Sequence, residues 1–156
     1  MPQYTVLTVG HGELNWADFL RLMRPHHIEV LVDIRSFPYC DGVPWFNRDQ
    51  LEHLARREGW EYVWLGGCLG PLTDDGRVDY LAKESEGRYR RGISQLLDLA
   101  AERRVCLLGT QADPLAGHRH QLIAQTLLHH DVAVEHVLHD GELMTAHADL
   151  FHGLGS

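Results

Sequence analysis

Short apolar runs alternate with stretches of helical periodicity along almost the whole chain, and this alternation limits the folds open to it. Each run has the length and composition of a strand; the runs span residues 4–10, 28–34, 60–65, 105–109 and 132–138, and the run at 60–65 alternates large apolar and polar residues. Apolar residues at helical spacing fill the segments 16–25, 48–58, 79–103 and 118–130. This alternation is typical of a parallel sheet covered by helices on both faces. We therefore predict an α/β, Rossmann-like three-layer fold with a mainly parallel sheet of about five strands.

Capping and turn residues mark where several of these helices begin and end. Asn15 is placed to cap the first helix, and the four residues from Asn47 to Gln50 have the form of a capping box for the second. Glycines and other turn formers in residues 66–76 predict a long loop after the third strand. After the last strand, a short helix is expected at 143–151.

Length and composition fit one globular domain. The chain has 156 residues, of which 44% are hydrophobic and 23% are charged, and we expect a single domain spanning residues 1–156. It contains no run of eighteen or more apolar residues, so no membrane-spanning helix is expected. The N-terminal residues lack the basic and apolar regions of a signal peptide, which predicts a cytoplasmic location. The oligomeric state stays open.

Charge and motif content argue against several kinds of partner. The formal net charge of −8 disfavours sequence-independent binding to nucleic acid, but it is compatible with a local basic pocket and with contact to a single exposed base. Neither a P-loop nor a GxGxxG fingerprint is present, so no nucleotide cofactor is expected. The three cysteines and twelve histidines show no spacing typical of a zinc site, and we expect no metal.

Polar side chains follow the predicted strands at the points where these strands end. In open parallel sheets, ligands bind outside the carboxyl ends of the strands. The residues that this rule selects are His11, Asp33, Arg35, Ser36, Pro38, Asp113, His118 and Arg119. Their convergence on one edge of the sheet predicts a site for a small anionic or heteroaromatic molecule.

Roles follow from the chemistry of these side chains. We expect His11 or His118 to move a proton and Asp33 to orient its partner, which makes these three the catalytic candidates. The expected binding residues are Arg35, Ser36, Pro38, Asp113 and Arg119. The guanidinium groups of Arg35 and Arg119 would hold the anion as planar donor forks. His118 and Arg119 also open a predicted helix, whose N-terminal field would favour an anion and lower the pKa of His118.

Plainer interpretations of the same residues stay open. Arg35 could instead form an internal ion pair with Asp33 or Asp113 that fixes a loop. His11 could be bonded to local backbone, and His118 or Arg119 could cap or pack. Among the aromatic residues, Phe37 and Trp45 could wall a pocket for a flat ligand, although the other large rings have the spacing of core residues.

The order of these motifs resembles a known family. In chain order these are Gly10-His11, Asp33-Ile34-Arg35-Ser36 with Pro38, Phe46-Asn47, a strand with Tyr62 followed by a Leu-Gly loop, and Asp113-Pro114 with His118-Arg119. In this ordered set of motifs the chain resembles the family called domain of unknown function 488. The likeness covers roughly residues 8–139. It implies an α/β, Rossmann-like fold with a site at the strand ends, and it implies no particular reaction.

The chain departs from this family pattern at three positions. Typical members carry Cys-x-Glu at the end of the fourth strand, where this chain has Gly109-Thr110-Gln111. They also carry a cysteine before the His-Arg pair, where this chain has Gly117. The chain is thus a divergent member without the family cysteines, and thiol chemistry is not expected of it.

Two hypotheses of function follow, and the sequence does not decide whether the protein is an enzyme. The first is an enzyme-like site that binds an anionic or heteroaromatic molecule and acts on it by histidine acid–base chemistry. The second is a non-catalytic module, descended from an enzyme, that binds a ligand or another protein. Restored cysteines at positions 109 and 117, with glutamate at 111, would create new reactivity only under the second hypothesis.

Overall fold

Six strands form one sheet in the computed structural model, which describes residues 4–149. The strands are β1 (Thr5–Gly10), β2 (Val30–Asp33), β3 (Glu61–Trp64), β4 (Val105–Gly109), β5 (Ala133–Val137) and β6 (Leu143–Thr145). Their order across the sheet is β3-β2-β4-β1-β5-β6. β1 to β5 are mutually parallel, and β6 runs antiparallel to β5.

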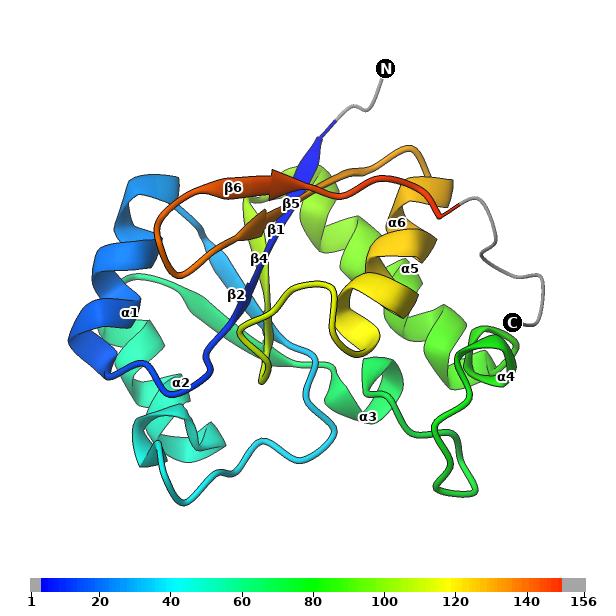
Figure 1. Cartoon of the computed structure of the whole chain (residues 1–156), viewed down its shortest axis with the longest axis horizontal. Helices are drawn as coiled ribbons and strands as arrows, with labels where there is room; N and C mark the ends of the chain where they lie inside the picture. The colour runs from blue at the N-terminus through cyan, green and yellow to red at the C-terminus, as the bar shows by residue number, and fades with distance from the viewer. Residues whose placement is uncertain (1–3, 150–156) are drawn as a thin grey trace.

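Helices cover both faces of this sheet (Figure 1). They are α1 (Trp16–Met23), α2 (Arg48–Arg57), α3 (Gly66–Leu69), α4 (Tyr80–Glu84), α5 (Gly87–Glu102) and α6 (Gln125–His129). Short 3₁₀ turns span Arg24–His26 and Pro44–Phe46, and a π-helix spans Arg119–Ala124 immediately before α6. Between residues 4 and 149, no helix is both long and apolar enough to cross a bilayer.

Two apolar cores lie on either side of the sheet, as the alternation of side chains along a strand requires. In β2, Val30 and Val32 belong to the core that includes α5 and α6, whereas Leu31 between them belongs to the core that includes α1 and α2. Every residue of β2 is buried, as expected of a parallel strand covered on both faces. The predicted α/β three-layer fold is therefore confirmed.

Three element predictions need correction. The segment expected as a terminal helix at 143–151 begins as the edge strand β6, because Glu135 to Val137 of β5 pair with it; residues 150 and 151 lie outside the described part. This adds a sixth strand to the five expected. Within the expected loop 66–76, the first four residues form the helical turn α3, and the segment 118–130 begins as a π-helix rather than as an α-helix.

The capping box predicted for α2 is also wrong. Asn47 occupies the capping position, but its side chain makes no hydrogen bond to the helix. Its Oδ1 atom instead accepts from the backbone N–H of Cys40 at 2.6 Å. The asparagine thus closes the loop that follows β2. By contrast, Asn15 caps α1 as predicted, with its Oδ1 atom 2.8 Å from the N–H of Asp18.

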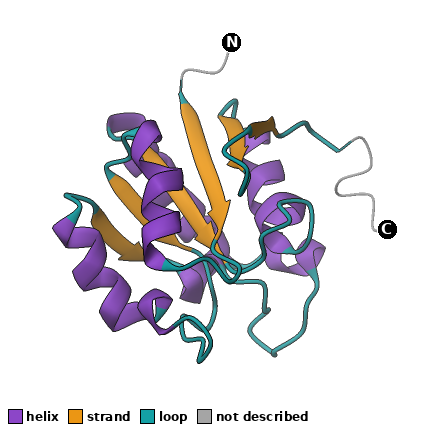
Figure 2. Ribbon diagram, turned by 60° about the vertical axis from the view of Figure 1, so that its left-hand side comes forward, coloured by secondary structure: helices purple, strands orange, loops and turns teal. Residues whose placement is uncertain are grey.

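The connections between strands create a crevice at the carboxyl end of β4. The chain leaves β1 and β2 toward α1 and α2 on one face, and it leaves β4 toward the π-helix and α6 on the other. Because β4 lies between β2 and β1, neighbouring loops part in opposite directions there. Figure 2 shows the loops gathered at the edge toward which the parallel strands point.

Candidate functional site

A cavity of about 360 Å³ opens at this crevice. Its lining comes from the segments 35–37, 109–111 and 116–119, with further contributions from Pro71, Val78 and Tyr80. Four of the eight site residues predicted from the sequence are part of this lining: Arg35, Ser36, His118 and Arg119.

The other four predicted residues lie outside the lining. His11 and Asp33 are fully buried, and both form hydrogen bonds with the side chain of Arg35. Pro38 is buried in the loop after β2, where its carbonyl accepts from the N–H of Arg48 at 2.9 Å. Asp113 is exposed, and its Oδ1 atom accepts from the N–H of Leu115 at 3.0 Å, which stabilises a local turn.

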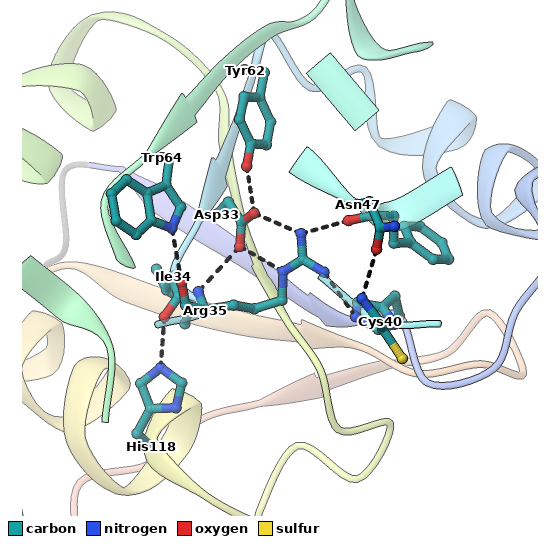
Figure 3. Close-up of polar contacts among 10 residues, drawn as sticks. Asp33, Ile34, Arg35, Cys40, Asn47, Tyr62, Trp64 and His118 are labelled. Atoms are coloured by element: carbon teal, nitrogen blue, oxygen red, sulfur yellow. Dashed lines mark hydrogen bonds and ion pairs between the residues drawn. The ribbon is translucent and has the colours of Figure 1, made fainter. Parts of the chain in front are cut away.

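Asp33 and Arg35 form a buried, bidentate ion pair (Figure 3). The Nε and Nη2 atoms of Arg35 donate to the two carboxylate oxygens at 2.8 and 2.7 Å, and Nη2 also donates to the carbonyl of Phe46 at 2.7 Å. The hydroxyl of Tyr62 donates to the same carboxylate at 2.5 Å, and burial raises the pKa of this phenol. Arg35 is therefore largely committed to holding the loop after β2, which is the plainer interpretation left open by the sequence.

Both ring nitrogens of His11 are engaged within the protein. Nδ1 lies 2.8 Å from the carbonyl of Gly12, which can only accept, so Nδ1 carries the proton. Nε2 then accepts from Nη1 of Arg35 at 3.2 Å. The ring stacks on Phe46 with centroids 4.6 Å apart, and burial lowers the pKa of His11 to about 4. The neutral imidazole accepts a hydrogen bond from Arg35 and so helps to fix the position of its guanidinium.

Arg119 is the buried cation of the cavity. The residue is only 3% exposed, and its guanidinium donates to the hydroxyl of Thr8 and to the carbonyl of Gln111, both at 2.8 Å. These acceptors are neutral, and no carboxylate within residues 4–149 lies within ion-pairing distance of it. Burial lowers the pKa of Arg119 to about 10, which leaves the side chain charged at neutral pH. A buried charge without a paired counter-charge is unfavourable unless something else compensates it.

A chain of hydrogen bonds continues from Arg119 into the core. Thr8 accepts from Arg119, so its own proton is available to Nδ1 of His136, 2.5 Å away. Nε2 of His136 then carries the ring proton and donates to Nδ1 of His120 at 3.0 Å. Burial lowers the pKa of His136 to about 3, which keeps this ring neutral. The chain fixes the guanidinium without neutralising it.

His118 is held in a single tautomer next to Arg119. Its Nε2 atom lies 3.0 Å from the carbonyl of Ile34 and therefore carries the proton (Figure 3). Burial, more than any other cause, lowers the pKa of His118 to about 4, and the charge of Arg119 adds to this. The sequence predicted the direction of this shift but assigned it to the helix end. At neutral pH, Nδ1 is consequently an unprotonated acceptor.

Two glycines, Gly109 and Gly117, line the cavity and affect the space inside it. A Cβ atom at Gly109 would lie 3.3 Å from Cδ and 3.4 Å from Nε of Arg119, so its absence opens space beside the guanidinium. Gly117 has φ of +79°, and a Cβ atom there would lie 2.7 Å from Oε1 of Gln111. A side chain at 117 is therefore strained, whereas one at 109 needs only a small adjustment.

No thiol lines the cavity. Cys106 is buried in β4, where burial raises the pKa of its thiol to about 12. Cys68 is half-buried in α3, and Cys40 is exposed in the loop after β2. The described part of the chain also brings together no group of three histidine, cysteine or acidic side chains able to hold a metal ion.

A larger cavity of about 600 Å³ lies between α5 and α6. Tyr89, Ile93 and Leu97 contribute apolar surface to it, and its charged lining residues, Glu84 and Arg90, are half-buried and exposed respectively. The Oε1 atom of Glu84 is buried there, but the lining includes no buried arginine or lysine among the described residues. The carboxyl-edge cavity is smaller, but it holds a buried guanidinium and is the candidate site.

Several residues of this site were not selected from the sequence. Thr8 and His136 are polar residues inside apolar strands, and this exception to the pattern was the available signal for both. Tyr62 was assigned to a strand without a role. Val78 lies in a segment without strand or helix periodicity, and Tyr80 was assigned to a helix without a role, so only the three-dimensional structure places them at the cavity.

A family model described as domain of unknown function DUF488 matches residues 15–127, which is more than half of the chain. The match confirms the resemblance expected from the ordered motifs. It includes every lining residue of the cavity and leaves out β1, β5 and β6. No curated protein matches the chain.

Proposed function

The chain belongs to the family described as domain of unknown function DUF488, and from this premise we propose that it binds a small anionic molecule in the carboxyl-edge cavity. Arg119 supplies the charge that attracts the anion, and the lining backbone and side chains supply further hydrogen bonds. Arg35 contributes to the wall of the cavity, because its own charge is balanced by Asp33.

One observation carries this proposal: Arg119 is a buried cation at a cavity, its hydrogen-bond acceptors are neutral, and among residues 4–149 it has no ion pair, although the exposed carboxylate of Asp113 acts on it from a greater distance. A bound anion would supply the missing counter-charge in a setting of low dielectric constant, where such an interaction is strong. The glycine at 109 supports the proposal, since it leaves the Nε side of the guanidinium uncovered.

His118 favours a second candidate function, proton transfer to or from the bound molecule. Its unprotonated Nδ1 atom can accept a proton, and it belongs to the same lining as Arg119. His11 is less suited to this step because both of its nitrogens are engaged. Turnover that His118→Gln abolishes while ligand affinity stays within about threefold would favour catalysis; binding without turnover would favour the non-catalytic module.

Isothermal titration with phosphate, sulfate and acetate tests the binding proposal. We expect at least one of these anions to bind the wild-type protein, and Arg119→Met to weaken that binding by at least about tenfold, as expected for a lost hydrogen bond to a charged group. The matched control is Arg57→Met, which removes an equal charge from an exposed position of α2. It should leave the affinity unchanged.

A second variant keeps the test decisive if Arg119→Met does not fold. Gly109→Val retains Arg119 and places a side chain against its Cδ and Nε atoms, so it should weaken the binding of the same anion by a similar factor. The proposal is wrong if neither these three anions nor an organic phosphate or carboxylate binds, or if anion binding survives both exchanges.

A further inference from the structure

Exposed apolar side chains line this cavity or lie close in sequence to residues that do. Among the described residues, seven large apolar side chains are exposed: Phe37, Tyr39, Leu72, Val78, Leu81, Leu115 and Leu143. All but Leu143 lie within two residues of the cavity lining. Phe37 and Val78 line the cavity itself although they are 74% and 65% exposed. Exposed apolar surface that gathers at one place usually marks a contact with a ligand or partner.

Local structure holds this apolar rim in place. Leu72 and Val78 pair in an antiparallel bridge, and the turn between them is closed by hydrogen bonds between Thr73 and Arg77. The buried ammonium of Lys83 donates to the carbonyl of Leu72 at 2.7 Å and pairs with Glu86 at 3.2 Å. The rings of Phe37 and Tyr39 contact each other with centroids 5.3 Å apart. These contacts present Phe37 and Val78 to solvent at fixed positions.

The cavity thus has two zones, a cationic floor at Arg119 and an apolar rim at Phe37 and Val78. We propose that its ligand is an amphipathic small molecule, with one anionic head and an apolar body of about one aromatic ring. This inference rests on the proposed function and narrows its ligand class. A simple inorganic anion would satisfy the floor but leave the rim exposed, whereas a ring attached to the anion would cover both. The cavity volume is at the small end of the roughly 300–1,000 Å³ typical of small-molecule sites.

A ligand series with a constant head tests this inference. Inorganic phosphate, methyl phosphate and phenyl phosphate are titrated into the wild-type protein by calorimetry, and acetate and benzoate form a parallel pair with a carboxylate head. We expect phenyl phosphate or benzoate to bind at least about tenfold more tightly than the small member with the same head. Phe37→Ser and Val78→Ser should each remove most of this gain and leave the affinity for the small anion within about twofold.

Leu143→Ser is the matched control, because Leu143 is an exposed apolar residue of β6 and does not line the cavity. It should change neither affinity. If the small anions bind and the ring adds nothing, this inference is overturned and the proposed function stands. If phenyl phosphate binds and its affinity depends on Phe37 but not on Arg119, the role of the apolar rim is supported and the proposed anion site at Arg119 is contradicted. If no anion of either series binds, both fail.

Discussion

Two buried arginines of this protein have opposite electrostatic situations, although both line the same cavity, Arg35 from the loop after β2 and Arg119 from the start of the π-helix. Arg35 is paired with Asp33 through two parallel hydrogen bonds and is further fixed by His11. Arg119 has neutral partners and no ion pair among the described residues. The two side chains therefore differ in role. Arg35 stabilises the loop after β2, whereas the guanidinium of Arg119 can still pair with a negatively charged ligand.

Removal of one member of the Asp33–Arg35 pair should destabilise the fold strongly. Asp33→Asn or Arg35→Met leaves a buried charge without its partner, and we expect each to lower the free energy of unfolding by about 3–5 kcal/mol. Urea denaturation of both variants and of the double variant measures this. The double variant should lose clearly less free energy of unfolding than the two single variants lose together. Additive losses would contradict the pairing of Asp33 with Arg35. For comparison, Glu52→Gln at the exposed Glu52–Arg56 pair should change the stability by less than about 1 kcal/mol.

The buried histidines should make the protein less stable in mild acid. Burial lowers the pKa of His11 and His118 from 6.5 to about 4, so below pH 6.5 the unfolded chain binds protons that the folded chain does not. Stability is therefore fully present above pH 6.5 and falls as the pH approaches 4, by about 1.4 kcal/mol per pH unit for each such histidine. Chemical denaturation between pH 4.5 and 7 should give a shallower slope for His118→Gln, and an unchanged slope would count against a buried neutral His118.

At the scale of the elements, hydrophobic patterning located β1 to β5, because each lies in a short run rich in apolar residues. β4 was predicted with its observed bounds, and β2 and β3 lie inside their predicted ranges. The errors arose where tertiary contacts outweigh local preference. β6 forms because an unpaired edge of β5 is available to it, and Asn47 serves a loop rather than a helix because the Cys40 N–H needs an acceptor.

The contrast between the two asparagines gives an element-scale prediction. Asn15→Ala removes the side-chain cap of α1 and should destabilise the protein by about 1 kcal/mol, whereas Asn15→Ser retains a capping oxygen and should cost only a few tenths. Thermal unfolding of both variants measures this. An alanine variant as stable as the serine variant would show that the cap contributes nothing to α1.

On the scale of the whole molecule, the net charge of −8 coexists with a buried positive site. This combination is possible because Arg119 is buried at the cavity, so the nearby guanidinium and not the distant surface charge dominates the field there. The fold places this site at the carboxyl end of β4, where the loops part.

The sequence indicated this edge of the sheet but not the arrangement of charges at it. Strand ends can be located from the apolar runs, so Arg35, Ser36, His118 and Arg119 could be brought together before the structure was known. Which arginine is neutralised depends on rotamers and on partners such as Thr8 and Tyr62, and these contacts join residues that lie far apart in the chain. Of the apolar rim, the sequence indicated Phe37 as a residue that could wall a pocket, whereas Val78 and its bridge to Leu72 could not be predicted.

The central claim is that Arg119 holds an anion inside the carboxyl-edge cavity, and selenate in crystals of the protein tests it most directly. Anomalous diffraction locates the selenium atom without assumptions about the ligand. We expect a selenium peak in the cavity within hydrogen-bond distance of the Arg119 guanidinium, and no such peak in crystals of Arg119→Met. An ordered cavity without selenium at saturating selenate, or a peak that persists after the exchange, would contradict the claim.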